Sequence, residues 1–111
     1  MRRSSVPRVT EDGAPVFAAL GDATRLRVVA RLSAEGPLSI TRLADGADVT
    51  RQAVTKHLQV LAGAGLVTGA REGRENVWTL DRRGLNEARR LLDAISREWD
   101  STLGRLRAFV E

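Results

Sequence analysis

The spacing of apolar and polar residues predicts four helices, then a β-hairpin, then one long helix. The four helices are predicted over residues 12–20, 23–33, 40–45 and 51–62. Asp22, Ser39 and Thr50 come directly before the last three helices, and residues of these types cap helix N-termini. The strands of the hairpin are predicted at residues 66–70 and 76–80, on either side of a glycine-containing loop. The pattern therefore favours a mainly helical domain with one small β element.

The second predicted helix has an apolar stripe that indicates its buried side. The stripe consists of Leu26, Val29, Ala30 and Leu32. Arginines lie between the stripe residues, and we expect them to point outward into solvent: Arg25, Arg27 and Arg31.

The fourth predicted helix has two chemically different sides. Leu58 and Leu61 fall within about 40° of Val54 on a helical wheel, which predicts the buried side. The opposite side has hydrogen-bonding side chains and no carboxylate: Arg51, Gln52, Thr55, Lys56 and Gln59. Groups of these types bond base edges in the DNA major groove, and Thr50 with the free amides of the first turn suits a phosphate. By itself this side also fits a solvated surface that lacks acids by chance, so the neighbouring elements decide.

The charge of the chain favours a polyanionic partner. All but one of its 18 basic residues are arginine, and 14 carboxylates leave a net charge of +4. A basic surface can also merely keep a protein soluble, so the distribution of the charge matters more than its sum. The excess is concentrated in residues 50–74, where the single acid Glu72 faces four basic residues: Arg51, Lys56, Arg71 and Arg74.

Composition and length indicate one soluble globular domain. The chain has 111 residues, 42% of them apolar and 29% charged, and no apolar run approaches the roughly 18 residues that span a bilayer. We expect a flexible basic arm at residues 1–10, without the apolar core of a secretory signal, and a single domain over residues 11–111. The absence of cysteine excludes disulfides, thiolate metal sites and a cysteine nucleophile. A cytoplasmic location with no membrane contact is the expectation.

The order of the predicted elements fits a DNA-binding fold. A short helix, a glycine-containing turn and a second helix with a basic outer side make a helix-turn-helix. The hairpin that follows carries Arg71 and Arg74 in its loop, where they can enter the adjacent minor groove or hold its phosphates. We therefore predict a mainly α (α+β) fold of the winged helix-turn-helix type, with the order α-α-α-α-β-β-α and double-stranded DNA as partner.

Several stretches of the sequence resemble the ArsR-type winged helix-turn-helix regulators. Residues 20–27, LGDATRLR, are similar to the L-G-D-x-T-R segment of that family. Residues 54–61, VTKHLQVL, followed by AGLV at 64–67, resemble its V-S-x-H-L-x-x-L…A-G-L-V recognition segment, and REGR at 71–74 matches its R-x-G-R wing. The likeness covers about residues 16–80. It implies a homodimeric bacterial repressor that binds an inverted repeat near its own promoter.

The sequence departs from the metal-sensing members of that family. In the family that the chain resembles, many members bind metals through cysteines on the third helix or through Asp and His ligands on the last helix. This chain has no cysteine and a single histidine, His57. We expect no metal and no other cofactor. His57 lies at the edge of the apolar stripe of the DNA-binding helix, as a packed or phosphate-bonding side chain. The ending of the chain resembles a metal-free subgroup, which implies that any effector is an unidentified small molecule or a partner protein.

The long helix predicted at residues 82–110 has an apolar seam that favours pairing with a second copy. At about 28 residues it is roughly 42 Å long, whereas a globule of this size has a radius of gyration of about 13 Å, so it runs most or all of the way across the domain. The alternative packs the seam wholly onto its own domain. In a two-fold pair the recognition helices would lie roughly 34–36 Å apart, one turn of DNA. We expect a homodimer whose interface uses the first helix and the long helix: Val16, Phe17, Leu20, Leu92, Ile95, Trp99, Leu103 and Leu106.

Two other classes of protein agree less well with the sequence. An enzyme lacks support, because the chain has no Ser, His and Asp set in plausible spacing, no glycine-rich phosphate loop and one histidine as its only neutral-pH acid or base. A winged-helix module that binds proteins and has lost specific DNA binding is the alternative. The basic and amide residues of the fourth helix and the hairpin loop argue against it.

Overall fold

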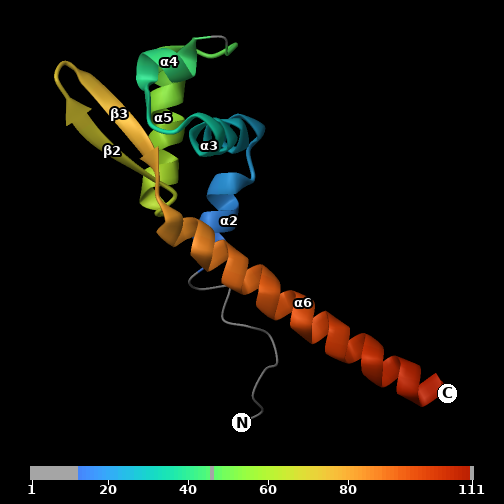
Figure 1. The fold of residues 1–111 in the computed structure, drawn as a ribbon. Coiled ribbons are helices and arrows are strands. Elements are labelled where there is room, and N and C mark those ends of the chain that lie inside the picture. Colours follow the sequence, from blue (N-terminus) through green and yellow to red (C-terminus); the bar gives the residue numbers. More distant parts are fainter. Residues whose placement is uncertain (1–12, 46, 111) are drawn as a thin grey trace.

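The structure is a computed structural model that describes residues 13–45 and 47–110. Its elements follow the chain in this order: α2 (Ala14–Leu20), α3 (Ala23–Glu35), β1 (Leu38–Ser39), α4 (Ile40–Ala44), α5 (Arg51–Gly63), β2 (Val67–Glu72), β3 (Glu75–Leu80) and α6 (Arg82–Val110). The order of the helices and the hairpin is confirmed, and the fold is a winged helix-turn-helix (Figure 1). The predicted basic arm at 1–10 and the predicted start of the first helix at residue 12 lie outside the described residues.

The three predicted N-caps are confirmed. The side chains of Asp22, Ser39 and Thr50 each accept a hydrogen bond from the backbone N–H three residues further on, at 3.0, 3.2 and 3.1 Å. Each bond satisfies a first-turn donor that has no partner within its own helix. Capping thus fixes where α3, α4 and α5 begin. No helix within the described ranges combines the length and the apolar composition that crossing a membrane requires.

The sheet has one strand more than the hairpin that the sequence predicts. β1 pairs antiparallel with β3, with Leu38 opposite Trp78, so that the strand order is β1-β3-β2. β1 has only two residues, and Gly36 and Pro37 directly before it are typical of a loop. A strand this short has no alternating pattern, which is why the sequence does not reveal it.

The hairpin turns more tightly than predicted. β2 reaches Glu72 and β3 begins at Glu75, and these two residues pair with each other, so that the loop has two residues and not five. Gly73 adopts a φ of 62°, a left-handed conformation that glycine reaches without steric cost and that two-residue hairpin loops use. Arg71 therefore belongs to β2, and of the two predicted loop arginines only Arg74 lies in the turn.

The inner side of α5 lies at the centre of the core. Leu58 and Leu61 are fully buried and Val54 is nearly so, as the helical wheel predicts. These side chains pack with buried residues of α3, α4 and the sheet in one cluster. Since burying a large aliphatic side chain stabilises a fold by about 1.5–3 kcal/mol, the inner side holds α5 firmly and leaves its outer side free for other roles.

The buried side of α3 differs from the predicted stripe. Leu26 and Ala30, both predicted to be buried, are exposed. The residues that α3 buries are Val28, Val29 and Leu32. Arg25 lies on the same face as Val28, Val29 and Leu32, because residues three, four and seven positions apart lie together on a helix. Val29 and Leu32 are therefore buried as predicted, and the sequence adds Leu26 and Ala30 to them because a charged residue such as Arg25 is unusual on a buried side without partners.

α6 begins against the end of α5 and then leaves the body of the domain (Figure 1). The backbone N–H of Gly84 donates to the carbonyl oxygen of Gly65 at 2.9 Å, and a Cβ at Gly84 would lie 2.5 Å from that oxygen, so the approach requires glycine. Further along the helix, Ala88 and Leu91 are buried. The molecule measures 64 × 30 × 20 Å and its radius of gyration is 18.3 Å, against about 13 Å for a globule of this length. The helix therefore projects beyond the domain instead of ending at its far side.

Candidate nucleic-acid interface

The outer side of α5 is a continuous polar surface, which we call the recognition ridge: Arg51, Gln52, Thr55, Lys56 and Gln59. These residues together line one shallow depression of about 510 Å³. All but Thr55 are exposed, and the hydroxyl of Thr55 donates to the carbonyl oxygen of Arg51 at 2.8 Å. The ridge carries no carboxylate. The side chains that the sequence selected on α5 are thus neighbours on one accessible surface.

The two cations of the recognition ridge, Arg51 and Lys56, have no acidic partner among the described residues. Neither Arg51 nor Lys56 forms an ion pair with another described residue. Both side chains are exposed. Their charges are therefore unpaired by the described acids, and they are chemically suited to a phosphate or to the acceptor edge of a guanine.

The start of α5 supplies backbone donors beside the ridge. Thr50 is exposed, and its Oγ1 accepts from the backbone N–H of Ala53 at 3.1 Å. The N–H groups of the residues before Ala53 have no carbonyl partner within the helix, and the helix dipole adds partial positive charge there. This end of α5 has the chemistry of an anion site, and it adjoins Arg51.

The wing, which is the hairpin of β2 and β3, lies beside α5 (Figure 1). Arg71 and Arg74 are exposed, and Nε of Arg71 donates to the carbonyl oxygen of Gly73 at 3.4 Å. Arg74 and Arg51 line the same depression of about 290 Å³. Its other walls are Ser39, Ile40, Thr41, Thr55, Glu75 and Asn76. The structure therefore joins the wing and the recognition ridge, and it adds Asn76, whose exposed amide no sequence pattern singles out.

His57 lies on a different side of α5 from the recognition ridge. Its ring is half-buried, its Nδ1 accepts a hydrogen bond from the Arg25 guanidinium at 3.2 Å, and Oδ1 of Asp22 is 4.0 Å away. The structure thus separates His57 from the other residues predicted to contact DNA. It places the ring between α5 and the start of α3, in a packed position.

Arg25 joins three helices, and the expectation that it points into solvent is wrong. Its Nε donates to the carbonyl oxygen of Ala19 in α2 at 2.7 Å, and its Nη1 donates to His57 in α5. The backbone N–H of Arg25 also donates to Asp22 and holds the pKa of that carboxyl below its usual value. Arg25 is therefore a positioning residue for α5. The sequence feature that could have revealed this role is the position of Arg25, a charged residue on the same helix face as the buried Val28.

Arg31 is likewise held by the protein, and its predicted outward direction is wrong too. Its Nε donates to Glu35 at 2.9 Å, and its Nη1 donates to the carbonyl oxygens of Arg42 and Leu43 at 3.1 and 3.3 Å. The ion pair raises the pKa of the Arg31 guanidinium and lowers the pKa of the Glu35 carboxyl. Arg31 therefore ties α3 to the end of α4.

The distal part of α6 has an apolar surface, which we call the α6 seam: Leu92, Ile95, Trp99, Leu103 and Leu106. All of these residues except the half-buried Leu103 are between 46% and 60% exposed. The first helix differs from its prediction, because Val16 is only 4% exposed and belongs to the chain's own core. Phe17 and Leu20 are half-buried against that core. The exposed apolar surface thus lies on α6, with Val16 excluded from it.

The sequence matches known regulators over this part of the chain. Residues 20–70 match the family described as a helix-turn-helix domain. Over 75 residues the chain is 45% identical to the HTH-type transcriptional regulator Rv2034 of Mycobacterium tuberculosis, covering 68% of this chain and 69% of that protein. Over 81 residues it is 37% identical to the HTH-type transcriptional regulator NmtR of the same organism, covering 70% of this chain and 67% of the relative.

Solved structures of the same kind match nearly the whole chain. An ArsR-like transcriptional regulator from Rhodococcus sp. RHA1 superposes with a TM-score of 0.80 at 36% identity, over 93% of this chain and 96% of that one. A possible transcriptional regulator for arsenical resistance superposes with a TM-score of 0.70 at 35% identity, over 85% of this chain and 94% of that one. Both matches extend well beyond residues 20–70 and into α6.

Proposed function

This chain belongs to the ArsR family of winged helix-turn-helix transcriptional regulators, and on that premise we propose that it is a homodimeric repressor of an inverted-repeat operator. DNA binding and transcription regulation come with the family. Which residues contact the operator, how two copies pair and the direction of regulation are the new part. The observation that carries the proposal is the recognition ridge, because its cations are exposed and unpaired by described acids.

The recognition ridge enters the major groove in this proposal. Gln52 and Gln59 have amides that can bond an adenine edge at two points, and Arg51 can do the same to guanine. The hydroxyl of the half-buried Thr55 donates its hydrogen bond to the backbone, so toward DNA its oxygen can only accept a hydrogen bond, and its methyl group can contact the methyl group of thymine. Lys56 and the start of α5 at Thr50 bind phosphates. Because of its contact with Arg25, His57 positions α5 and does not read bases.

The wing binds the DNA next to the recognition ridge. Arg74 lies in the turn and shares a depression with Arg51, so the two cations can follow one stretch of the duplex. Arg71 extends this basic surface along β2. Contacts of this kind go to phosphates or to the narrow minor groove, so they raise affinity for every sequence more than they select one.

The α6 seam pairs with the α6 seam of a second copy. Large apolar residues on this seam are about half exposed, so burying the rest of each would stabilise an interface by about half of the roughly 1.5–3 kcal/mol that burial of a whole side chain gives. Phe109 and Val110 extend the same exposed apolar surface toward the end of the helix. A two-fold pair would set its recognition ridges about one DNA turn apart, roughly 34–36 Å, which matches an inverted repeat.

The remaining parts of the proposal concern regulation. Occupancy of an operator blocks the polymerase without any further contact, so repression needs no activating surface. The protein works in the cytoplasm, on the chromosome. It uses no metal, since it has no cysteine and the ring of its one histidine is engaged by Arg25. Any effector is a small molecule or a partner protein.

Genome-wide footprinting of the protein tests the proposal as a whole. We expect the protected sites to contain two half-sites related by a dyad, and purified protein to bind them more tightly than scrambled DNA. Trp99→Asp places a charge in the α6 seam, so this variant should sediment as a monomer and lose the sites. Ser101→Asp, on the opposite side of α6, is the control and should retain both. Sites without a dyad, or a dimeric Trp99→Asp protein, would contradict the proposal.

A further inference from the structure

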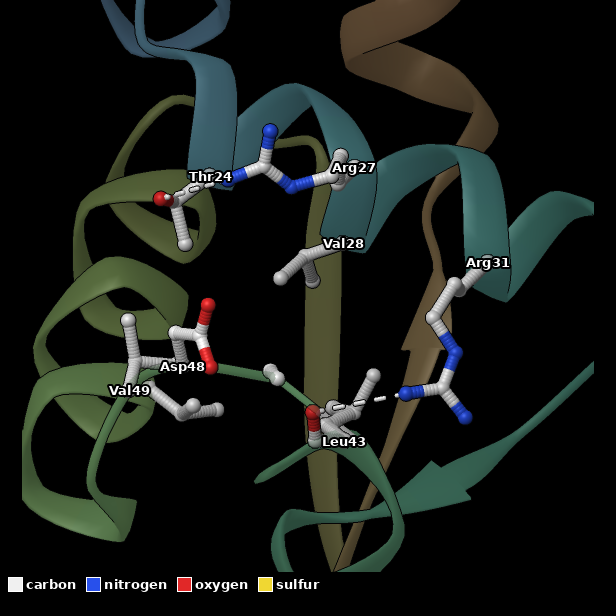
Figure 2. Close-up of a pocket in the computed structure, with 9 residues that line it drawn as sticks. Thr24, Arg27, Val28, Arg31, Leu43, Asp48 and Val49 are labelled. Carbon is white, nitrogen blue, oxygen red and sulfur yellow. Dashed lines mark hydrogen bonds between the residues drawn. The ribbon is translucent and has the colours of Figure 1, made fainter. Parts of the chain in front are cut away.

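A cavity of about 560 Å³ lies between α3 and the helix-turn-helix (Figure 2). Its size falls within the range of about 300–1,000 Å³ that is typical of small-molecule sites. It is lined by Thr24, Arg27, Val28, Arg31, Leu43, Ala47, Asp48, Val49 and Val54. The cavity is separate from the two depressions on the DNA-facing side, which share no lining residue with it. Neither the DNA contacts nor the dimer seam uses it.

The floor of the cavity is apolar and reaches the core. Val28, Leu43 and Val54 line it, and each is less than 9% exposed. They come from α3, α4 and α5 respectively, so the cavity opens at the junction of these helices. Val49 adds a half-buried apolar wall from the turn before α5. An apolar body of a few carbon atoms is the chemistry that this floor accepts.

The rim of the cavity has one cation, Arg27, and one anion, Asp48, that form no ion pair with a described residue. Nη2 of Arg27 donates to Oγ1 of Thr24 at 3.3 Å, which leaves other N–H groups of the guanidinium for a ligand. Figure 2 shows the Asp48 carboxylate directed from the turn into the space below Thr24 and Arg27. No ion pair within 4.0 Å joins these two described side chains. Arg31, by contrast, is held by Glu35 and by carbonyl oxygens.

We propose that this cavity binds a small zwitterion with an apolar body, the chemistry of an apolar α-amino acid. Its carboxylate would meet Arg27 and the Thr24 hydroxyl, its ammonium group would meet Asp48, and its side chain would cover the apolar floor. Opposite charges on the rim favour a ligand that carries both signs. A simple acid would face repulsion from Asp48, and a simple amine would face repulsion from Arg27.

The position of the cavity links it to DNA binding, a step that rests on the proposed function. The turn that carries Asp48 and Val49 leads directly to Thr50, the cap of α5. Val54 in the floor lies on α5, whose opposite side is the recognition ridge. A ligand that contacts these residues biases how α5 packs against α3. The ligand and the operator must then change each other's affinity by the same factor.

Three probes of equal skeleton test the site in the absence of DNA: leucine, 4-methylpentanoate without the amine, and 3-methylbutylamine without the carboxylate. NMR titration of the full chain should show saturable shifts for leucine at Val28, Val49 and Val54. Each single-charge analogue should bind at least about tenfold more weakly, since a hydrogen bond to a charged group has that weight. Methionine and phenylalanine extend the series. No saturable shift at these valines with any of the three amino acids would overturn the proposal.

Two exposed rim residues make the matched variants, so folding is not at risk. In Arg27→Gln, leucine should bind no better than 3-methylbutylamine, and in Asp48→Asn no better than 4-methylpentanoate. Arg42→Gln and Asp45→Asn, exposed residues close to the same turn, are the controls and should bind leucine normally. Binding that ignores Arg27→Gln and Asp48→Asn places leucine elsewhere and overturns the site.

A final titration tests the link between the cavity and DNA. Leucine should shift the affinity of wild-type protein for its operator, and the shift should vanish in Asp48→Asn. Equal leucine affinity for free and DNA-bound protein would overturn the link. Loss of DNA binding itself would contradict the proposed function and leave the titration without DNA unaffected, so the two failures are distinguishable.

Discussion

α3 and α5 are helices of the same length and similar charge, but they differ in what their basic side chains contact within the protein. Both have 13 residues, and each buries three apolar side chains. All the arginines of α3 donate to the chain's own groups: Arg25 to Ala19 and His57, Arg27 to Thr24, and Arg31 to Glu35, Arg42 and Leu43. The cations of α5 form no ion pair with any described residue. A count of basic residues therefore does not locate a nucleic-acid surface.

The difference arises from where the two helices lie in the fold. α3 is surrounded by other elements, and carbonyl oxygens near the ends of α2 and α4 face its arginines. Such carbonyls lack partners within their own helices and attract cations. On the outer side of α5 every residue of the recognition ridge except Thr55 is exposed. What distinguishes a binding cation from a structural one is whether the protein already supplies its acceptors.

The largest expected effect concerns which side of α3 is buried. Leu32→Ala should lower the free energy of unfolding by about 2–5 kcal/mol, because Leu32 is 2% exposed and the substitution leaves a cavity. Leu26→Ala, at a position that is 53% exposed, should cost less than about 1 kcal/mol. Urea unfolding of both variants measures the difference. Equal losses would mean that Leu26 faces the core together with Leu32, as in the predicted stripe.

The next effect separates a structural arginine from a binding one. Arg25→Ala should lower the free energy of unfolding by about 1–3 kcal/mol, because it leaves the partly buried Ala19 carbonyl and the His57 ring without a donor. Arg51→Ala should change the free energy of unfolding by less than about 0.5 kcal/mol. Thermal and urea unfolding check both values. If Arg51→Ala destabilised the protein as much as Arg25→Ala, the distinction between α3 and α5 would not hold.

The specificity of α5 can be measured separately from its affinity. Gln52→Ala should reduce the preference for operator over random DNA by about 1–3 kcal/mol, since a bidentate contact to a base is lost. Arg74→Ala should instead weaken binding to all sequences alike, because we propose that the wing contacts the DNA backbone and not base edges in the major groove. Competition titrations with operator and scrambled fragments distinguish these results. An unchanged preference in Gln52→Ala would remove this residue from the base-reading set.

The smallest effect is a pH dependence that the cap of α3 has and the cap of α5 lacks. The Arg25 backbone N–H lowers the pKa of Asp22, so the ionised cap stabilises the folded state above the unfolded pKa, and this contribution is lost as the pH falls through the folded pKa. Asp22→Asn should keep a capping oxygen, cost little near neutral pH and flatten the loss of stability in acid. Thr50→Ser, at a cap that does not titrate, should leave the acid profile unchanged. Urea unfolding between pH 7 and pH 3 measures both profiles.

Most of the fold was predictable because local signals agree with one another. The three caps mark where helices begin, the apolar stripe of α5 marks its buried side, and the helix-turn-helix with its wing follows from the order of the elements. β1 was not predictable, because two residues have no period. The tight wing turn depends on the positive φ of Gly73. Glycine permits such a φ but also many others, so the sequence alone does not give the length of the turn. Val16 was predicted at the dimer interface because an apolar position in a sequence looks the same whether it packs in the chain's own core or against a partner.

The sequence predicted the residues of the candidate site that are simply exposed on one helix side. It did not predict the positions of residues that are held by contacts with other elements. The recognition ridge follows from helical spacing and the absence of acids. Arg25 and Arg31 were predicted to point outward, and the packed position of His57 was one of two alternatives, because partners of these residues lie in other elements, up to 32 residues away in sequence. Only the folded arrangement brings a guanidinium of α3 to a ring of α5. The same holds for the cavity beside α3, whose walls come from four separate segments.

The salt dependence of operator binding tests most directly whether the cations of α5, and not those of α3, meet DNA. Each phosphate contact that is lost reduces the slope of log affinity against log salt by about 0.9, so Lys56→Ala in both copies of a dimer should reduce it by about two. Arg31→Ala, measured where it is fully folded, should leave the slope unchanged. An unchanged slope in Lys56→Ala together with a reduced slope in Arg31→Ala would place the DNA on α3 and contradict the account.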